Sequence, residues 1–119
     1  MAKFLFIYRD PITRTAPEMS PDEMQEHMQK WFDWLGGGQA AGWVLEMGNP
    51  LTPEGRVVTK DGSVTDGPYA ESKELVGGYS MIQARDYDHA CELAKGCPIF
   101  VSGGLVEVRE IAEICDAAS

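Results

Sequence analysis

The chain has 119 residues, of which 44% are hydrophobic and 24% charged, and it carries a formal net charge of −9. This composition is typical of a soluble globular protein, and the length suits one domain with one continuous core, taken as residues 1–119. Ten basic residues against 19 acidic ones argue against nucleic acid and against anionic membrane surfaces as partners.

Targeting and redox signals are weak along the whole chain. No apolar run approaches the roughly 20 residues that span a bilayer. The N-terminal sequence MAKFLFIYRD lacks the long apolar region and the small-residue cleavage site of a signal peptide. Cys91, Cys97 and Cys115 show no CxxC spacing, which favours reduced thiols over a disulfide framework or a zinc site. The sequence therefore predicts a cytoplasmic protein.

The first half of the chain predicts a strand, a helix and a second strand. The apolar run 3–8 (KFLFIY) is typical of a buried strand. Ser20 and Glu23 enclose a proline and form a capping-box signature for a helix start. Three glycines at 36–38 are expected to end or interrupt this helix, and the run 43–47 predicts a short strand. The expected buried side of the helix consists of Met24, Met28, Trp31, Phe32 and Leu35.

The second half predicts a hairpin, a strand, a helix and a last strand. Asp61-Gly62 lies between the β-prone runs 56–60 and 63–66, which indicates a hairpin with a type I′ turn. The run 79–84 predicts the next strand, and the alternating run 105–111 predicts the last. Asp86 is expected to cap the second helix, whose buried side would be Tyr87, Ala90, Cys91 and Ala94.

This order of elements defines a fold class. Strand, helix, strand, hairpin, strand, helix, strand is a split βαβ pattern, so we expect an α+β, ferredoxin-like fold with helices on one face of an antiparallel sheet. The other face needs cover, and a second copy of the chain would supply it. We therefore predict a homodimer with sheets packed face to face; the alternative is a polar, solvated second face.

The stretch 65–82, TDGPYAESKELVGGYSMI, carries a resemblance to a known family. It resembles the signature of the YCII-related family in its DGPF branch, which reads DGPF-A-E-x-K-E-x-x-G-G-[FY] before a strand. Tyr69 stands where that branch usually has Phe, and the other fixed positions match. GCP at 96–98 and VEVREI at 106–111 resemble two further pieces of the family pattern, so the resemblance covers nearly the whole chain.

The resemblance implies the dimeric α/β-barrel variety of the ferredoxin-like fold. The wider superfamily includes muconolactone isomerases and cofactor-free monooxygenases, which act on small aromatic or lactone substrates in a cleft between helix and sheet. By fold-level analogy it implies an unknown small-molecule ligand for this chain.

His27 is the first candidate catalytic residue. It lies on the flank of the first helix with Trp31 and Trp34, and Glu23 is one turn earlier. A histidine at the edge of an apolar stripe suits a general base in a cleft, and the YCII family often has a histidine in this helix. The alternative is a helix-surface histidine paired with Glu23.

Asp66 is the second candidate catalytic residue, because it ends a strand and begins the Asp-Gly-Pro turn. Its carboxylate would either stabilise the loop through an Asx-turn or stand at the mouth of the cleft near His27. A histidine and a carboxylate together are the minimum set for proton transfer.

Contacts to the ligand are expected from both halves of the chain. Tyr69, Glu71 and Lys73 would point the same way in an extended segment; they form either part of the site, an exposed charge pair or a contact with a second copy. Gly77-Gly78 indicates a sharp bend or the close approach of another segment, and no phosphate-loop pattern is present. The expected substrate-binding residues are Trp31, Met47, Tyr69, Glu71, Lys73 and Tyr79.

The leading hypothesis is a small protein that binds an aromatic or lactone-like molecule between the first helix and the sheet. His27 and Asp66 would transfer protons there without metal or cofactor. One alternative is a non-catalytic ligand-binding or accessory module working with a transcription regulator, and another is a structural dimer domain.

Overall fold

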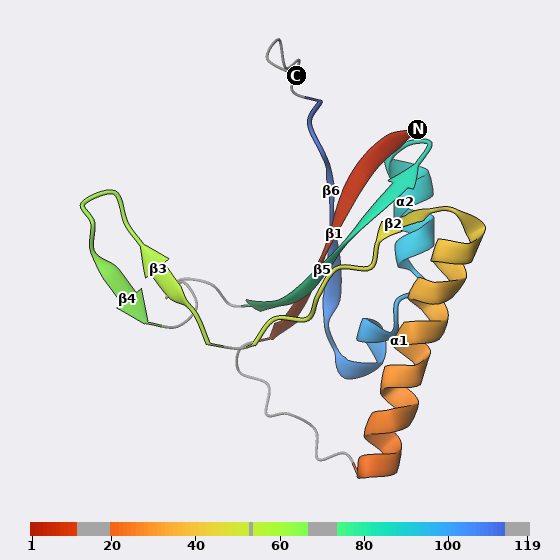
Figure 1. Cartoon of the computed structure of the whole chain (residues 1–119), viewed down its shortest axis with the longest axis horizontal. Coiled ribbons are helices and arrows are strands. Elements are labelled where there is room, and N and C mark those ends of the chain that lie inside the picture. Colours follow the sequence, from red (N-terminus) through yellow and green to blue (C-terminus); the bar gives the residue numbers. More distant parts are fainter. Residues whose placement is uncertain (12–19, 53, 67–73, 114–119) are drawn as a thin grey trace.

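The computed structural model describes residues 1–11, 20–52, 54–66 and 74–113 (Figure 1). Within these ranges, no helix combines the length and the apolar character needed to cross a membrane. The elements, in chain order, are β1 (Ala2–Pro11), α1 (Pro21–Ala41), β2 (Val44–Glu46), β3 (Arg56–Val58), β4 (Val64–Asp66), β5 (Glu74–Ala84), α2 (Tyr87–Ala94), the 3₁₀-helix η1 (Pro98–Ser102) and β6 (Leu105–Glu110).

Four strands form the main sheet, in the order β2-β5-β1-β6 with antiparallel neighbours. Both helices lie on one side of this sheet, while β3 and β4 form a separate hairpin that projects on the other side (Figure 1). The predicted α+β, ferredoxin-like split βαβ fold is therefore confirmed. The β3–β4 hairpin is an arm inserted in the chain between β2 and β5.

Alternation along β1 separates the two faces of the sheet. Phe4 pairs with Ile82, Phe6 with Ser80, and all four side chains are fully buried on the side of the helices. The intervening residues, Leu5 and Ile7 among them, point to the opposite face and are half-buried. The core under the helices includes Phe4, Phe6, Tyr8, Leu35, Val44, Ile82, Ala90, Cys97 and Ile99.

Helix α1 begins as the sequence predicts and ends later. Ser20 and Glu23 form the capping box, but the helix passes through the three glycines and ends at Gly42, whose φ is +91°. Gly38 explains the difference, since it is buried and a Cβ there would lie 2.5 Å from the Trp43 ring. The glycine thus permits close packing of α1 on β2 and does not terminate the helix.

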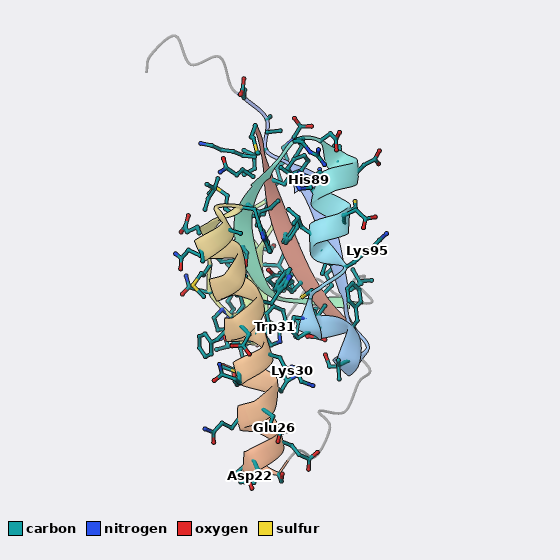
Figure 2. The ribbon with its side chains drawn as sticks, turned by 90° about the vertical axis from the view of Figure 1, so that its right-hand side faces the viewer. Asp22, Glu26, Lys30, Trp31, His89 and Lys95 are labelled. Carbon is teal, nitrogen blue, oxygen red and sulfur yellow. The ribbon has the colours of Figure 1, made fainter. Side chains whose placement is uncertain are left out.

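The buried side of α1 also differs from the expected stripe. Leu35 is buried and Trp31 half-buried, but Met24, Met28 and Phe32 are 48%, 46% and 56% exposed. Figure 2 shows the reason: the N-terminal half of α1 extends beyond the end of the sheet, so none of the described strands lies beneath it. An apolar strip remains open on this part of the helix.

The hairpin and the second helix show two smaller corrections. In the β3–β4 turn only Gly62 has a positive φ, so the predicted type I′ turn is wrong. Instead, the Asp61 carboxylate accepts hydrogen bonds from the Thr59 hydroxyl and the Ser63 N–H, which lower the pKa of Asp61 to about 2. In α2, Asp86 caps the helix as predicted, but Cys91 is exposed.

The glycine positions of α1 allow a matched test of packing. Gly38→Ala is expected to lower the free energy of unfolding by about 1–3 kcal/mol, because the new methyl group overlaps Trp43 and Val44. Gly37→Ala is the control, since its Cβ would meet nothing within 4 Å; it is expected to gain up to about 1 kcal/mol from helix propensity. Urea unfolding measures both, and equal stabilities would contradict the packing role of Gly38.

Candidate functional site

A pocket of about 380 Å³ lies between the middle of α1 and the end of the sheet. Its wall is mostly apolar, as is usual for small-molecule sites. The larger apolar side chains that line it are Met28, Trp31, Phe32, Leu35, Met47 and Ile99. The polar ones are Tyr8, Asp10, His27, Asn49, Tyr79 and Ser102. Of the residues expected to bind substrate, Trp31, Met47 and Tyr79 are therefore in the pocket wall.

His27 lines the pocket together with Trp31, one turn further along α1 (Figure 2 labels Trp31). The indole N–H of Trp31 donates a hydrogen bond to Nε2 of His27 at 3.2 Å. The alternative of a surface histidine paired with Glu23 is wrong. The Glu23 carboxylate instead accepts a hydrogen bond from the Ser20 N–H and completes the helix cap. The partner of His27 is thus the tryptophan that also forms the pocket wall.

Aromatic rings continue from this wall into the core. Trp31 and Tyr8 meet edge to face at 4.8 Å between centroids, and Trp34 contacts both of these rings. Trp43 in turn packs against Trp34 at 5.6 Å. Trp34 and Trp43 belong to a supporting layer behind the pocket, because neither is among the residues that line it. The layer fixes the position of Trp31.

Tyr8 anchors the floor of the pocket through a buried hydrogen bond to Ser80, which a second, partly buried bond extends to Met47. Its hydroxyl donates to Oγ of Ser80 at 2.7 Å, and Ser80 donates to the Met47 carbonyl oxygen at 2.7 Å. Burial raises the pKa of Tyr8 well above its ordinary value, with Ser80 opposing this and Cys97 adding to it. Tyr8 therefore stays protonated and acts as a donor within the protein.

The glycine pair of β5 lies where a second segment pairs closely alongside the strand at the pocket. Gly77 is the extra residue of a bulge opposite β1, because Tyr8 pairs with Gly78 and Arg9 with Val76. The chain after β2 continues antiparallel to β5 at this point, where Pro50 bridges to Gly78. A Cβ on Gly78 would lie 3.1 Å from the Asn49 carbonyl oxygen. The close approach that Gly77-Gly78 predicted is therefore present.

This pairing brings Asn49 beside Tyr79. The side-chain amide of Asn49 donates to the Tyr79 hydroxyl at 3.2 Å. Tyr79 pairs with Ile7, so its side chain points away from the helices, although both residues belong to the pocket lining. Asn49 was not among the residues that the sequence singled out.

The carboxylate that shares the pocket with His27 is Asp10, and sequence reasoning missed it. β1 continues to Pro11 because it pairs with β5 over its whole length, whereas the apolar run had suggested an end at Tyr8. Asp10 follows Tyr8 by two residues and reaches the same pocket. The two-residue spacing of Phe4, Phe6 and Tyr8, extended by one step, was the signal that would have found it.

Asp66 lies elsewhere, at the end of β4 on the projecting arm. Its carboxylate is 3.1 Å from Nε of Arg56, its side chain is 89% exposed, and it is not among the residues that line the pocket. The single chain therefore does not bring Asp66 and His27 together. Tyr69, Glu71 and Lys73 lie outside the described residues.

The thiols of the described residues are unlike one another. Cys97 is buried, and this burial raises its pKa to about 12, so the thiol carries its proton at neutral pH. Cys91 is exposed on α2. Among the residues that the structure describes, no group of three or more His, Cys, Asp or Glu side chains is arranged to hold a metal ion.

Comparison with known proteins identifies the family. The family model of the YCII-related domain matches residues 3–115, so the chain belongs to the YCII-related family. No curated protein matches the sequence.

The floor of the pocket can be tested through Ser80. Ser80→Ala is expected to lower the free energy of unfolding by about 1–3 kcal/mol, because it leaves the buried Tyr8 hydroxyl and the Met47 carbonyl without partners. Ser102→Ala is the control, since Ser102 is only half-buried and donates within its own turn to Ile99; a loss below about 1 kcal/mol is expected. Thermal or urea unfolding measures both, and a Ser80→Ala loss no larger than the control would contradict the role of this bond.

Proposed function

We propose that this protein binds a small, mostly apolar molecule of the aromatic or lactone-like kind in the pocket between α1 and the sheet. The observation that carries the proposal is the pocket itself: about 380 Å³, walled by Trp31, Phe32 and two methionines, with a few polar residues from several elements. A small aromatic or lactone ring fits such a space, and its burial against aromatic and methionine side chains favours binding.

Proton-transfer chemistry on such a ligand is the finer proposal. His27 would be one of its groups, as the sequence suggested. Asp10 replaces Asp66 as the carboxylate in the proposal, because it lines the same pocket as His27 whereas Asp66 is paired with Arg56 on the arm. The motif 65–82 supports placing the chain in the DGPF branch of its family.

The binding proposal is tested with phthalide, an aromatic lactone, and salicylate, an aromatic acid, as probes. Titration of each into ¹⁵N-labelled protein is expected to shift the indole N–H signal of Trp31. Phe32→Ala is expected to weaken binding roughly tenfold, because it removes part of an apolar wall at little cost to the core, given that Phe32 is 56% exposed.

Phe100→Ala is the matched control for this experiment. Phe100 is 49% exposed, also on a helix, and does not line the pocket. Its replacement is expected to leave the affinity of the probes unchanged. If neither probe shifts Trp31, or if both variants lose affinity equally, the pocket is not the binding site for molecules of this class.

We further propose that two copies of the chain pair through the open face of the main sheet. Leu5, Ile7 and Met81 lie on this face, half-buried and covered by no described segment of the chain. The β3–β4 arm projects on the same side (Figure 1) and carries the cross-strand pair Val58 and Val64, which are 69% and 61% exposed. A lone two-stranded hairpin is marginally stable in water, so contact with a second copy would stabilise the arm.

The mass in solution tests the pairing. Light scattering is expected to give twice the chain mass of 13.1 kDa for the wild type. Ile7→Glu buries a charge in the proposed interface and is expected to give monomers. Met24→Glu, at an exposed site on the helical side, is the control and should remain paired. A monomeric wild type, or an Ile7→Glu variant that keeps the doubled mass, would refute this interface.

A further inference from the structure

One polar side chain in the pocket wall already uses one side of its hydrogen-bonding capacity within the protein. Nε2 of His27 accepts from the Trp31 indole at 3.2 Å. This contact limits what His27 is able to offer to a ligand. The chemistry of the ligand follows from what is left.

His27 is restricted to a donor role in its neutral form. A neutral imidazole has one N–H donor and one acceptor nitrogen, while an indole N–H only donates. Because the lone pair of Nε2 takes the Trp31 proton, the proton of the ring must sit on Nδ1. No described residue accepts a hydrogen bond from this Nδ1–H. What His27 has left for a ligand is an N–H group.

Tyr79 does not offer a second donor to the same ligand. It pairs with Ile7 in the β1–β5 register, so its side chain points to the face of the sheet away from the helices, and its hydroxyl accepts from the Asn49 amide there. The donor for a ligand in the pocket is therefore His27 on α1.

The acceptor on the ligand is more consistent with a neutral group than with an anion. The described residues that line the pocket include no lysine or arginine to pair with a carboxylate. The chain as a whole carries a net charge of −9, and this field repels anions. A carbonyl oxygen meets the requirement, since it accepts hydrogen bonds without bringing a charge into an apolar pocket.

We propose that the pocket selects ligands with a neutral carbonyl group on an apolar ring, held by the Nδ1–H of His27, with Trp31 as the residue that fixes the tautomer of His27. This inference rests on the proposed binding function of the pocket. A donor at this position polarises a carbonyl, so His27 acts on the ligand as an electrophile and leaves the role of base to another group.

The first test needs no ligand and uses the two histidines of the chain. His89 provides an internal control of opposite kind, because its Nδ1 accepts from the Arg85 N–H at 3.1 Å and its proton must sit on Nε2. Long-range ¹H–¹⁵N NMR spectra over a pH series are expected to show an Nδ1–H tautomer for His27 and an Nε2–H tautomer for His89. Trp31→Phe keeps an aromatic ring but removes the indole N–H, so it should change the tautomer signals of His27 alone.

The second test uses phthalide and phthalan, which have the same bicyclic ring. Phthalide has a carbonyl group at the position where phthalan has a methylene group. Phthalide is expected to bind roughly three- to tenfold more tightly, the worth of about one hydrogen bond to a neutral acceptor. Trp31→Phe should reduce this ratio toward one, whatever its effect on the affinity for phthalan. Salicylate is expected to bind more weakly than phthalide.

The outcomes separate this inference from the proposed function. Binding of both bicyclic probes with equal affinity, or stronger binding of salicylate, keeps the pocket as a binding site and overturns the selection for a neutral carbonyl. An Nε2–H tautomer of His27 in the wild type overturns the role of Trp31 whatever binds. Failure of all probes to bind, with the expected tautomers present, overturns the proposed function and the ligand class together but leaves the tautomer assignment standing.

Discussion

A short chain of buried hydrogen bonds, from Tyr8 through Ser80 to the Met47 carbonyl, is the constraint on which the rest of the site depends. Buried polar groups must find partners, and here each partner comes from a different segment. The chain joins β1, β5 and the segment after β2 at the end of the sheet. Because Tyr8 also lines the pocket, the same bonds that satisfy a buried hydroxyl hold the pocket floor in place.

The pocket exists because two glycines and one helix leave space around this floor. Gly77 and Gly78 have no side chains to fill the end of the sheet, and the segment after β2 pairs alongside β5 there through the Pro50–Gly78 bridge. On the other side, α1 extends past the strands (Figure 2). The resulting wall combines apolar side chains and His27 from the helix with polar groups from the end of β1.

Apolar surface that one chain leaves open is distributed unequally between the two sides of the molecule. Met28 and Phe32, although exposed, form the helical lip of the pocket. Leu5, Ile7 and the valines of the arm lie on the opposite side of the sheet and do not line the pocket. The first group therefore serves the ligand site in our proposal and the second the pairing of two copies. In this proposal, separate regions of one small domain serve binding and assembly.

The sequence by itself determined the order of the elements, the helix caps, the ferredoxin-like fold and the family, because capping and periodicity are set by residues a few positions apart. It also indicated the close approach at Gly77-Gly78. Only the tertiary structure decided which residues meet: Asp10 and not Asp66 beside His27, Trp31 and not Glu23 as the partner of its ring, and Gly38 as a packing position within a continuous helix. These outcomes depend on strand register, on how far α1 overhangs the sheet and on contacts between residues distant in the chain, none of which leaves a local pattern in the sequence.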